Sequence, residues 1–569
     1  MRGEDKNMRR WIARILCAAM LLSLAACGKT ETSGESATLT GKANGFGGVV
    51  TATVTTEGGK ITSVTFDGPD ETPTIGGAAL ETLAAAMTEA GSVEVDLVAG
   101  ATVTSTAAVA AVNNALDPEA YPYEAPEEKD DSKTLEGADL YHGLGIVSSG
   151  RQGPGADDQD VPVYSFNTVA VQALFDGEGK IVALNVDQVE VATPNYDGAS
   201  MPNFAGYPGM GGYNVDEDHD GKVDGVLEPT DDSFLEEVSS WQTKRERGSE
   251  YQLGSGTWTD EMNAYEQFFV GMTVDEVEAW FAANCSDANG RPLKITDKSS
   301  DEDKAKFEAL SEDEQAALVD LTSSATMSLQ DAHGDILTAI RAAYDARKAI
   351  DVTADQIASM GLGIVSNGRQ GPGSDDQDVP VYSMNMVFAA TLLDENNAIL
   401  DSYVDQVEVA TPNYDGDGMP HFSGWPGQSA YNADTDHDGK VDATVEPTAE
   451  SFLEEVSSWQ TKRERGDGYK LGSGTWAEEM DAYQEFFAGK TIDEIQAWFA
   501  SSCSDANGRP LKITDKSSDE DKAKYDALNE DQQAALVDLT TSATMSLQDA
   551  HGDILTALAK SCENARATA

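Results

Sequence analysis

One long stretch of this chain occurs twice, and the second copy follows the first directly. "GLGIVSSGRQGPGADDQDVPVYS" begins at Gly143, and "GLGIVSNGRQGPGSDDQDVPVYS" begins 218 positions later, at Gly361. The same spacing separates Cys285 from Cys503, so neither copy has gained or lost residues between these points. A period of this length indicates two whole domains rather than a solenoid of short repeats.

The chain is long and strongly acidic. Its 569 residues exceed what one hydrophobic core organises, so several domains are expected. Hydrophobic residues make up 40% of the sequence, which is typical of globular packing rather than disorder. Lys and Arg number 38 against 100 Asp and Glu, which gives a formal net charge of -62. Such a surface repels nucleic acid, so we predict no nucleic-acid partner.

The N-terminal segment has the pattern of a bacterial export signal. Arg9 and Arg10 precede a short apolar run, and "LAAC" (Leu24 to Cys27) resembles a lipobox. The run is too short for a transmembrane helix. We therefore predict that residues 1–26 are a signal peptide and that Cys27 carries a lipid. The mature chain would then be anchored on the extracytoplasmic face of the cell membrane, and an uncleaved signal anchor is the alternative.

Cysteine usage argues against redox metal centres. Of five cysteines, Cys17 and Cys27 lie in the leader, and no C-x-x-C pair occurs. This pattern argues against c-type haem and iron–sulfur clusters. The state of Cys285, Cys503 and Cys562 stays open, with a Cys503–Cys562 disulfide as one option outside the cytoplasm.

Composition and repeat position divide the rest of the chain into segments. The predicted segments are a polar tether over 27–38, a small domain over 39–116, an acidic, Pro-rich linker over 117–139, and two long domains over 140–348 and 361–569 that a helical junction over 349–360 joins.

The small domain and the two long copies share one order of elements. In each, two alternating strands flank a turn, which is "EGGK" from Glu57, "DGEGK" from Asp176 or "DENNA" from Asp394. A Thr-Pro step follows the second strand, and a helix closes the unit. We therefore expect one α+β fold used three times, with large insertions in the two long copies.

A short motif recurs near the end of each unit. It reads "DLVAGATVTSTAAVAAV" from Asp96, "DLTSSATMSLQDAHGDIL" from Asp320 and "DLTTSATMSLQDAHGDIL" from Asp538. We expect each motif to open an apolar helix. Helix capping is the simplest explanation, because Asp, Ser and Thr are favoured at helix N-termini.

The Gly-rich start, the hairpin, "ETP" and then D-x-x-[S/T]-G-A-T together resemble the FMN-binding domain family. That family occurs in subunits of sodium-pumping NADH–quinone reductase, in the Rnf complex and in Gram-positive lipoproteins for extracellular electron transfer. The resemblance implies that a flavin transferase links FMN through its phosphate to the last Thr of the motif. On this sequence the acceptors would be Thr102, Thr326 and Thr544, which allows one to three covalent FMN groups.

The resemblance also implies roles for the residues before each acceptor. Asp96, Asp320 and Asp538 would position the metal and phosphate of the transferase, and Gly100 and Ala101 would leave space for its approach. The motif departs from the family in two places. Ala99 stands in the first copy where the family has Ser or Thr, and Ser324 and Ser542 replace the Gly in the long copies. A Thr at a helix start would place the phosphate near free backbone N–H groups and the positive end of the helix dipole.

Two acidic loops fit the first part of a calcium-binding loop. "DEDHDGKVD" and "DTDHDGKVD" follow the pattern D-x-D-x-D-G-x-x-D. The predicted ligands are Asp216, Asp218, Asp220 and Asp224 in the first copy and Asp434, Asp436, Asp438 and Asp442 in the second. The acid expected at position 12 is missing, since Leu227 and Val445 stand there, although Glu228 or Glu446 follows. A solvated acidic turn is the alternative.

Three further features are weaker candidates for flavin contacts. Lys244, Arg245, Lys462 and Arg463 would face a phosphate or a reduced ring, or would form ion pairs on a helix. His333 and His551 are expected on the helix after each acceptor. The aromatic loops from Thr193 and Thr411 would stack on a flavin or wrap onto the core.

The sequence thus predicts an electron-transfer flavoprotein or a component of a reductase complex rather than a stand-alone enzyme. Its partners would be the flavin transferase, a membrane reductase or quinone-linked donor, and a redox acceptor outside the membrane. The alternatives are a calcium-stabilised cell-surface binding lipoprotein, with flavin on the first domain or none, and the electron-input part of a flavin reductase complex.

Overall fold

The computed structural model divides the chain into two compact units, Met1–Pro126 and Glu127–Ala569. It describes residues 36–45, 48–69, 76–93, 95, 97–98, 101–118, 120–123, 140–198, 200–416, 418–469, 471 and 474–568. The predicted lipid attachment site Cys27 and the motif residues Asp96 and Gly100 lie outside these residues.

The small unit is an antiparallel sheet covered by helices. Its elements are β1 (Ser36–Asn44), β2 (Val49–Glu57), β3 (Lys60–Asp67), α2 (Ala78–Ala90) and α3 (Thr102–Leu116), with strand order β1-β2-β3. The predicted hairpin is present, and Gly58 and Gly59 form its turn with φ of 59° and 81°. Strand β1 begins at Ser36, inside the predicted tether, because this segment pairs with β2 along its whole length.

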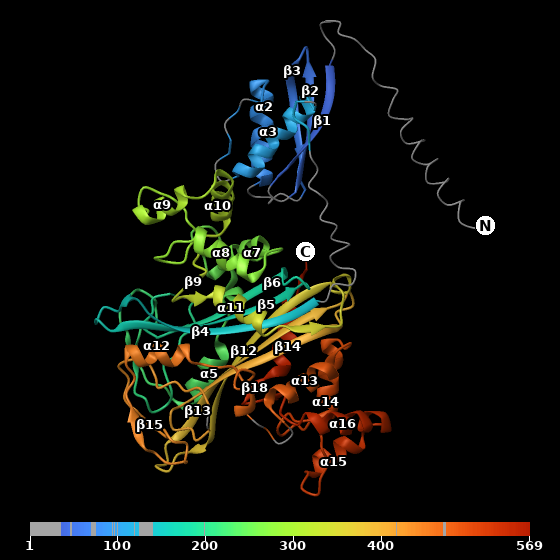
Figure 1. The fold of residues 1–569 in the computed structure, drawn as a ribbon. Helices are drawn as coiled ribbons and strands as arrows, with labels where there is room; N and C mark the ends of the chain where they lie inside the picture. Colours follow the sequence, from blue (N-terminus) through green and yellow to red (C-terminus); the bar gives the residue numbers. More distant parts are fainter. Residues whose placement is uncertain are drawn as a thin grey trace, which may run out of the picture. The chain divides into compact units, whose positions relative to one another are not determined.

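The larger unit contains two four-stranded antiparallel sheets, one in each repeat (Figure 1). The first has the order β11-β4-β5-β6 and the second the order β14-β13-β12-β19. The strands are β4 (Leu140–Ala156), β5 (Pro162–Phe175), β6 (Ile181–Ala192), β11 (Lys348–Ile350), β12 (Ser359–Ser374), β13 (Pro380–Leu393), β14 (Ile399–Ala410) and β19 (Arg566–Ala567).

The helices of the larger unit come mainly from the insertions. In the first repeat they are α5 (Asp231–Ser240), α6 (Lys244–Arg247), η2 (Gly248–Glu250), α7 (Trp258–Phe269), α8 (Val274–Asn284), α9 (Asp301–Glu308), α10 (Glu312–Ser324) and α11 (Ile336–Asp345). In the second repeat they are α12 (Ala449–Ser457), η4 (Gly466–Gly468), α13 (Trp476–Phe487), α14 (Ile492–Ser502), α15 (Asp519–Asp526), α16 (Glu530–Ser542) and α17 (Ile554–Glu563).

Short two-stranded ladders complete the larger unit. β7 (Tyr213–Val215) pairs with β8 (Gly225–Leu227), and β15 (Tyr431–Ala433) pairs with β16 (Ala443–Val445). The remaining pairs are β9 (Gln330–Asp331) with β10 (Gly334–Asp335) and β17 (Gln548–Asp549) with β18 (Gly552–Asp553).

The junction between the repeats is not the helix that the sequence predicts. Its first residues form β11, which pairs antiparallel with β4, and only Ala354–Gln356 forms a short 3-10 turn, η3. The prediction was wrong because edge pairing with an open strand satisfies the backbone of this segment. The end of the second repeat does the same, since β19 pairs with β12.

A helix packs closely on the first strand in the small unit and in both repeats. α3 packs on β1, α11 on β4 and α17 on β12. A Cβ added at Gly41, Gly143 or Gly361 would overlap a backbone carbonyl of the packed helix. These glycines therefore permit the same close approach three times, which confirms the predicted α+β fold and supports its repeated use.

Each repeat has a hydrophobic core of its own, and the two repeats share a third core between their sheets. Helix α5 of the first repeat packs on β12 of the second, and α12 of the second packs on β4 of the first (Figure 1). Hydrogen bonds also connect the two repeats. Tyr382 Oη donates to Asp231 Oδ1 at 2.6 Å, and Tyr207 Oη donates to the Val409 carbonyl at 3.0 Å.

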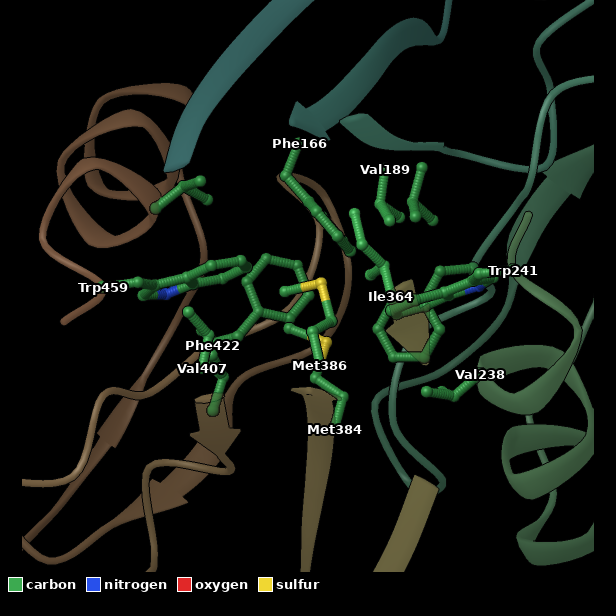
Figure 2. Close-up of a cluster of buried hydrophobic side chains, with 14 of the residues drawn as sticks. Phe166, Val189, Val238, Trp241, Ile364, Met384, Met386, Val407, Phe422 and Trp459 are labelled. Atoms are coloured by element: carbon green, nitrogen blue, oxygen red, sulfur yellow. The ribbon is translucent and has the colours of Figure 1, made fainter. Parts of the chain in front are cut away.

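Aromatic side chains fill the space between the sheets. Figure 2 shows Phe166, Trp241, Phe422 and Trp459 meeting there from both repeats. Phe166 stacks on the fully buried Trp425, with 5.7 Å between ring centroids. The aromatic loops that were candidates for a flavin pocket contribute to this core, so the alternative interpretation, an ordered loop on the core, is correct.

We predict that Trp425→Ala destabilises both repeats together. The change removes the stack on Phe166 and the hydrogen bond from Trp425 Nε1 to the Phe204 carbonyl, and leaves a cavity. The free energy of unfolding should fall by about 3–5 kcal/mol. Urea denaturation followed by circular dichroism measures this loss. The exposed Val537→Ala is the control, and a variant in which only the second repeat unfolds early would contradict a shared core.

Candidate functional site

The first predicted acceptor, Thr102, is the first residue of helix α3, as its motif predicts. Ala101, the residue before it, is buried and is the N-cap of the helix. The first turn of a helix presents backbone N–H groups and the positive end of the helix dipole. This position therefore fits a phosphate linked to the Thr102 hydroxyl, although the structure describes only the backbone of Thr102.

The second acceptor, Thr326, does not open a helix, so that prediction was wrong. It follows α10, whose C-cap is Ala325, and the apolar helix α11 begins only at Ile336. The reason is that Asp335 caps α11, since its Oδ1 accepts from Thr338 N at 2.8 Å. Thr326 therefore lies near the negative end of a helix dipole, which disfavours a phosphate.

The third acceptor, Thr544, repeats this arrangement. It follows the C-cap of α16, Ala543, and α17 begins at Ile554 under the cap of Asp553. The motif aspartates Asp320 and Asp538 lie within α10 and α16, six residues before the acceptors.

A buried carboxylate accepts hydrogen bonds from the backbone N–H groups at each of these two threonines. Glu261, which is fully buried on α7, accepts from Thr326 N at 2.6 Å and from Met327 N at 2.8 Å. Its oxygens also lie 3.3 Å from Thr326 Oγ1. Glu479 makes the equivalent bonds in the second repeat, at 2.7 and 2.8 Å. The N–H groups that a phosphate would use thus already bind a carboxylate.

A cavity opens beside this segment in each repeat. In the first repeat, which we call the Lys244 cavity, it is lined by Gln188, Lys244, Tyr251, Leu253, Trp258, Arg291, Met327, Ser328, Asp331, His333, Gly334 and Ile336. In the second repeat, the Lys462 cavity, it is lined by Gln406, Lys462, Tyr469, Leu471, Trp476, Arg509, Met545, Ser546, Asp549, His551, Gly552 and Ile554. Every position holds the same residue type in both cavities.

Lys244, a lining residue of the cavity, belongs to a buried ion pair. Lys244 Nζ lies 3.0 Å from Glu190 Oε2, and both side chains are almost fully buried. The ammonium also lies 5.5 Å from the ring centre of Tyr251 and 5.9 Å from that of Trp258. Burial alone would raise the pKa of Glu190, but the charge of Lys244 outweighs it and keeps this pKa below its ordinary value.

The tight turn between β9 and β10 forms the mouth of the cavity. Side chains of the sheet hold it, since Asn167 Nδ2 donates to the Ala332 carbonyl at 3.1 Å and Gln188 Nε2 donates to the His333 carbonyl. His333 Nδ1 lies 3.0 Å from Asp331 Oδ2. His333 is thus in the turn and not on the following helix, which corrects the prediction, and His551 occupies the same place in the second repeat.

Arg245 and Arg463, two of the predicted flavin contacts, form ion pairs instead. Arg245 Nη2 lies 2.7 Å from Glu266 Oε1, and Arg463 Nη2 lies 2.8 Å from Asp481 Oδ1. Lys244 and Lys462 are the residues of that set that reach a cavity.

A second, more open cavity in each repeat is lined by cations. Its volume is about 460 Å³ in the first repeat, and Arg291, Lys294, Lys298 and Thr326 are among its lining residues. Lys294 Nζ donates to the Thr322 carbonyl at the end of α10. Arg291 lines both cavities, whereas Thr326 lines the open one.

The acidic loops bring three of the four predicted ligands together in each copy. The groups within the described residues are Asp216, Asp218 and Asp224, and Asp434, Asp436 and Asp442, each with carboxylate oxygens within 4.8 Å of one another. Asp220 and Asp438 stand outside these groups and pair with Lys222 and Lys440. Backbone N–H groups donate to the aspartate side chains and close the loops, as Gly221 N does to Asp216 Oδ2 at 2.9 Å.

The three described cysteines are free thiols, so the Cys503–Cys562 disulfide is absent from the described part of the chain. Burial raises the pKa of Cys285 and of Cys503 to about 12, which leaves both as inert thiols.

The sequence pointed to Lys244 and His333 but missed Tyr251, Trp258 and Arg291. These three lie in the insertion, outside any recurring motif, and only the fold of the insertion brings them to the cavity. The lining residues are the same in the two copies, but this agreement does not distinguish them in the sequence, because the copies agree at many other positions as well.

Comparison with known proteins adds two findings. Residues 45–117 match the model of the FMN-binding domain family. The chain is also 36% identical over 223 residues to chlorophenol reductase of Desulfitobacterium hafniense, a match that covers 37% of this chain and 59% of that protein. The chain therefore spans less than two thirds of this relative's length. Together the matches support FMN as a cofactor and a flavin-linked electron-transfer role.

We predict that Asp187→Asn combined with Asp405→Asn changes how stability depends on pH. Burial, opposed by Arg245 and Arg463, raises the pKa of both carboxyls from 3.8 to about 6. The folded state therefore keeps a proton that the unfolded chain loses, so the wild type loses stability as pH rises from about 4 to about 6. The double variant should not show this part of the loss.

Urea denaturation at a series of pH values measures the difference between the two proteins. The exposed pair Asp297→Asn and Asp515→Asn is the control and should follow the wild type. Parallel pH profiles for the wild type and the Asp187 and Asp405 variant would show that these carboxyls are ionised throughout.

Proposed function

We propose that this protein is a lipid-anchored electron carrier on the extracytoplasmic face of the cell membrane, with FMN linked covalently through its phosphate to Thr102. Bound FMN accepts and releases electrons one or two at a time. The carrier takes electrons from a membrane reductase or quinone-linked donor and passes them to a redox acceptor outside the membrane, and a flavin transferase attaches the cofactor.

The observation that carries this proposal is the position of Thr102. It lies in the segment that matches the FMN-binding domain family, and it begins helix α3. A phosphate on its hydroxyl would meet the N-terminal end of the helix, where backbone N–H groups and the dipole favour an anion. A covalent link also suits an exported protein, because dilution outside the cell would strip away a dissociable cofactor.

Of the one to three FMN groups that the sequence allows, we propose one. Thr326 and Thr544 each follow the C-terminal end of a helix, and Glu261 or Glu479 occupies the neighbouring N–H groups. Cations of the open cavities, such as Arg291 and Arg509, would attract a phosphate there, but the neighbouring N–H groups already bind a carboxylate and the nearest helix end is a negative one.

The location rests on the leader and on Cys27. Arg9 and Arg10, the apolar run and "LAAC" support export and lipid attachment. Within the described residues, none of the helices combines the length and the apolar character needed to cross a bilayer.

We predict that Thr102→Ala removes all covalent flavin from the protein. The wild type, produced together with a flavin transferase, should carry one FMN-sized mass increment and flavin fluorescence that survives denaturation. The variant should carry neither, because its only proposed acceptor hydroxyl is gone. Intact-mass spectrometry of both proteins gives the answer.

Thr106→Ala is the matched control, since it removes an exposed hydroxyl from the same helix and should leave the increment in place. An increment that persists in Thr102→Ala and disappears on adding Thr326→Ala or Thr544→Ala would move the cofactor to the repeats. A wild type without any increment would overturn the proposal.

A calcium-stabilised cell-surface binding protein is the second candidate function. The two groups of clustered aspartates favour it, because oxygen ligands on a tight acidic loop are what Ca²⁺ requires. Asp216 and Asp434 are buried while their neighbours face solvent, so an ion there would tie the loop to the domain. The proposed role is structural and is compatible with a flavin at Thr102.

We predict that Ca²⁺ raises the melting temperature of the wild type and that Asp216→Asn combined with Asp434→Asn abolishes this rise. Each substitution removes one ligand charge from a loop, which weakens its affinity for Ca²⁺. It also reduces the repulsion between the aspartates in the calcium-free protein. Differential scanning calorimetry with Ca²⁺ and with a chelator measures the effect. The control Asp287→Asn with Asp505→Asn alters exposed acids and should keep the response, and an unchanged wild type would refute calcium binding.

A further inference from the structure

We propose that each long repeat binds a small phenolate, a single aromatic ring with an acidic oxygen, in the Lys244 cavity or the Lys462 cavity. The inference concerns residues 140–568 and does not depend on flavin at Thr102. It rests on the size of the two cavities, on the side chains that line them and on their charge.

The size of the cavities selects a single ring. Their volumes are about 130 Å³ for the Lys244 cavity and about 110 Å³ for the Lys462 cavity. An apolar protein cavity of about 150 Å³ accommodates benzene. The three fused rings of a flavin need more space than this and would extend out of the cavity, whereas a single ring fits inside it.

The walls of the cavity suit a flat aromatic ligand. Tyr251 and Trp258 present ring surfaces, and Leu253, Met327 and Ile336 add apolar contacts. Aromatic rings pair well with such neighbours, because stacking and sulfur contacts add to the burial of apolar area.

The charges of the cavity favour an acidic oxygen. Lys244 is neutralised by Glu190 at 3.0 Å, and Asp331 is satisfied by its own turn, since it accepts from His333 N at 2.7 Å and pairs with His333 Nδ1. The lining thus holds two cations, Lys244 and Arg291, against one carboxylate, Asp331, and an acidic oxygen would meet the guanidinium of Arg291. In a chain with a net charge of -62, such a place attracts anions locally.

The second repeat provides an independent copy of this argument. Lys462 lies 2.9 Å from Glu408, 5.3 Å from the ring centre of Tyr469 and 5.9 Å from that of Trp476. His551 Nδ1 lies 3.1 Å from Asp549 Oδ2. The chain should therefore hold two equivalent sites.

The test is fluorine NMR with pentafluorophenol, which is ionised at neutral pH, added to the full chain produced without a flavin transferase. Binding should saturate at two ligands per chain. Arg291→Gln combined with Arg509→Gln should weaken it by about tenfold, the effect of losing a charge-assisted contact. The neutral ring hexafluorobenzene should bind more weakly than the phenolate.

Two further variant pairs separate the site from general effects. Lys298→Gln with Lys516→Gln removes cations that line only the neighbouring open cavities and should leave binding unchanged. Leu253→Phe with Leu471→Phe fills both cavities and should abolish binding, and circular dichroism verifies that these proteins are folded.

Several results would overturn the inference. The folded wild type could show no saturable binding, or the variant with Arg291→Gln and Arg509→Gln could bind as tightly as the wild type. Competition by riboflavin would assign the cavities to a flavin ring instead. None of these results bears on the mass increment at Thr102, because the protein in this experiment carries no flavin.

Discussion

The shared aromatic core between the two repeats is the interaction on which the larger unit depends. Phe166 of one repeat stacks on Trp425 of the other, and α5 and α12 each pack on the sheet of the opposite repeat. Gly150 and Gly368 leave the space for these exchanged helices, since a Cβ there would lie 3.1 Å from Phe452 or Phe234. Neither sheet could bury its inner face alone, so the duplication yields one body with two equivalent sites.

The repeats differ from the small unit in the position of the motif threonine relative to the helices. In the small unit the motif leads directly into α3, and Thr102 starts that helix. In the repeats the turn between β9 and β10 separates the motif threonine from the closing helix, and Asn167 and Gln188 hold this turn against the sheet. The motif threonine is thereby moved from the positive end of one helix to the negative end of another. Similar sequence motifs thus place their threonines in opposite electrostatic environments.

Buried charges in the repeats are arranged in compensated pairs beside the cavities. Glu190 and Lys244 neutralise one another, as do Glu408 and Lys462, and removing either partner would leave an uncompensated buried charge. These pairs keep Tyr251 and Trp258 in place around a cation while the outer surface stays acidic. The result is a pair of small cavities, each with two cations in its lining, in a strongly negative protein.

The sequence by itself determined the duplication, the three α+β units, the hairpins and the start of α3 at Thr102, because these follow from local periodicity and turn chemistry. It also pointed to four aspartates in each acidic loop, since they are close in the chain, and the structure brings three of each four together. Only the tertiary structure decided the edge pairing of the junction, the place of Thr326 and His333, and the meeting of Lys244, Trp258 and Arg291. Those depend on contacts between segments far apart in the chain, which local pattern does not encode.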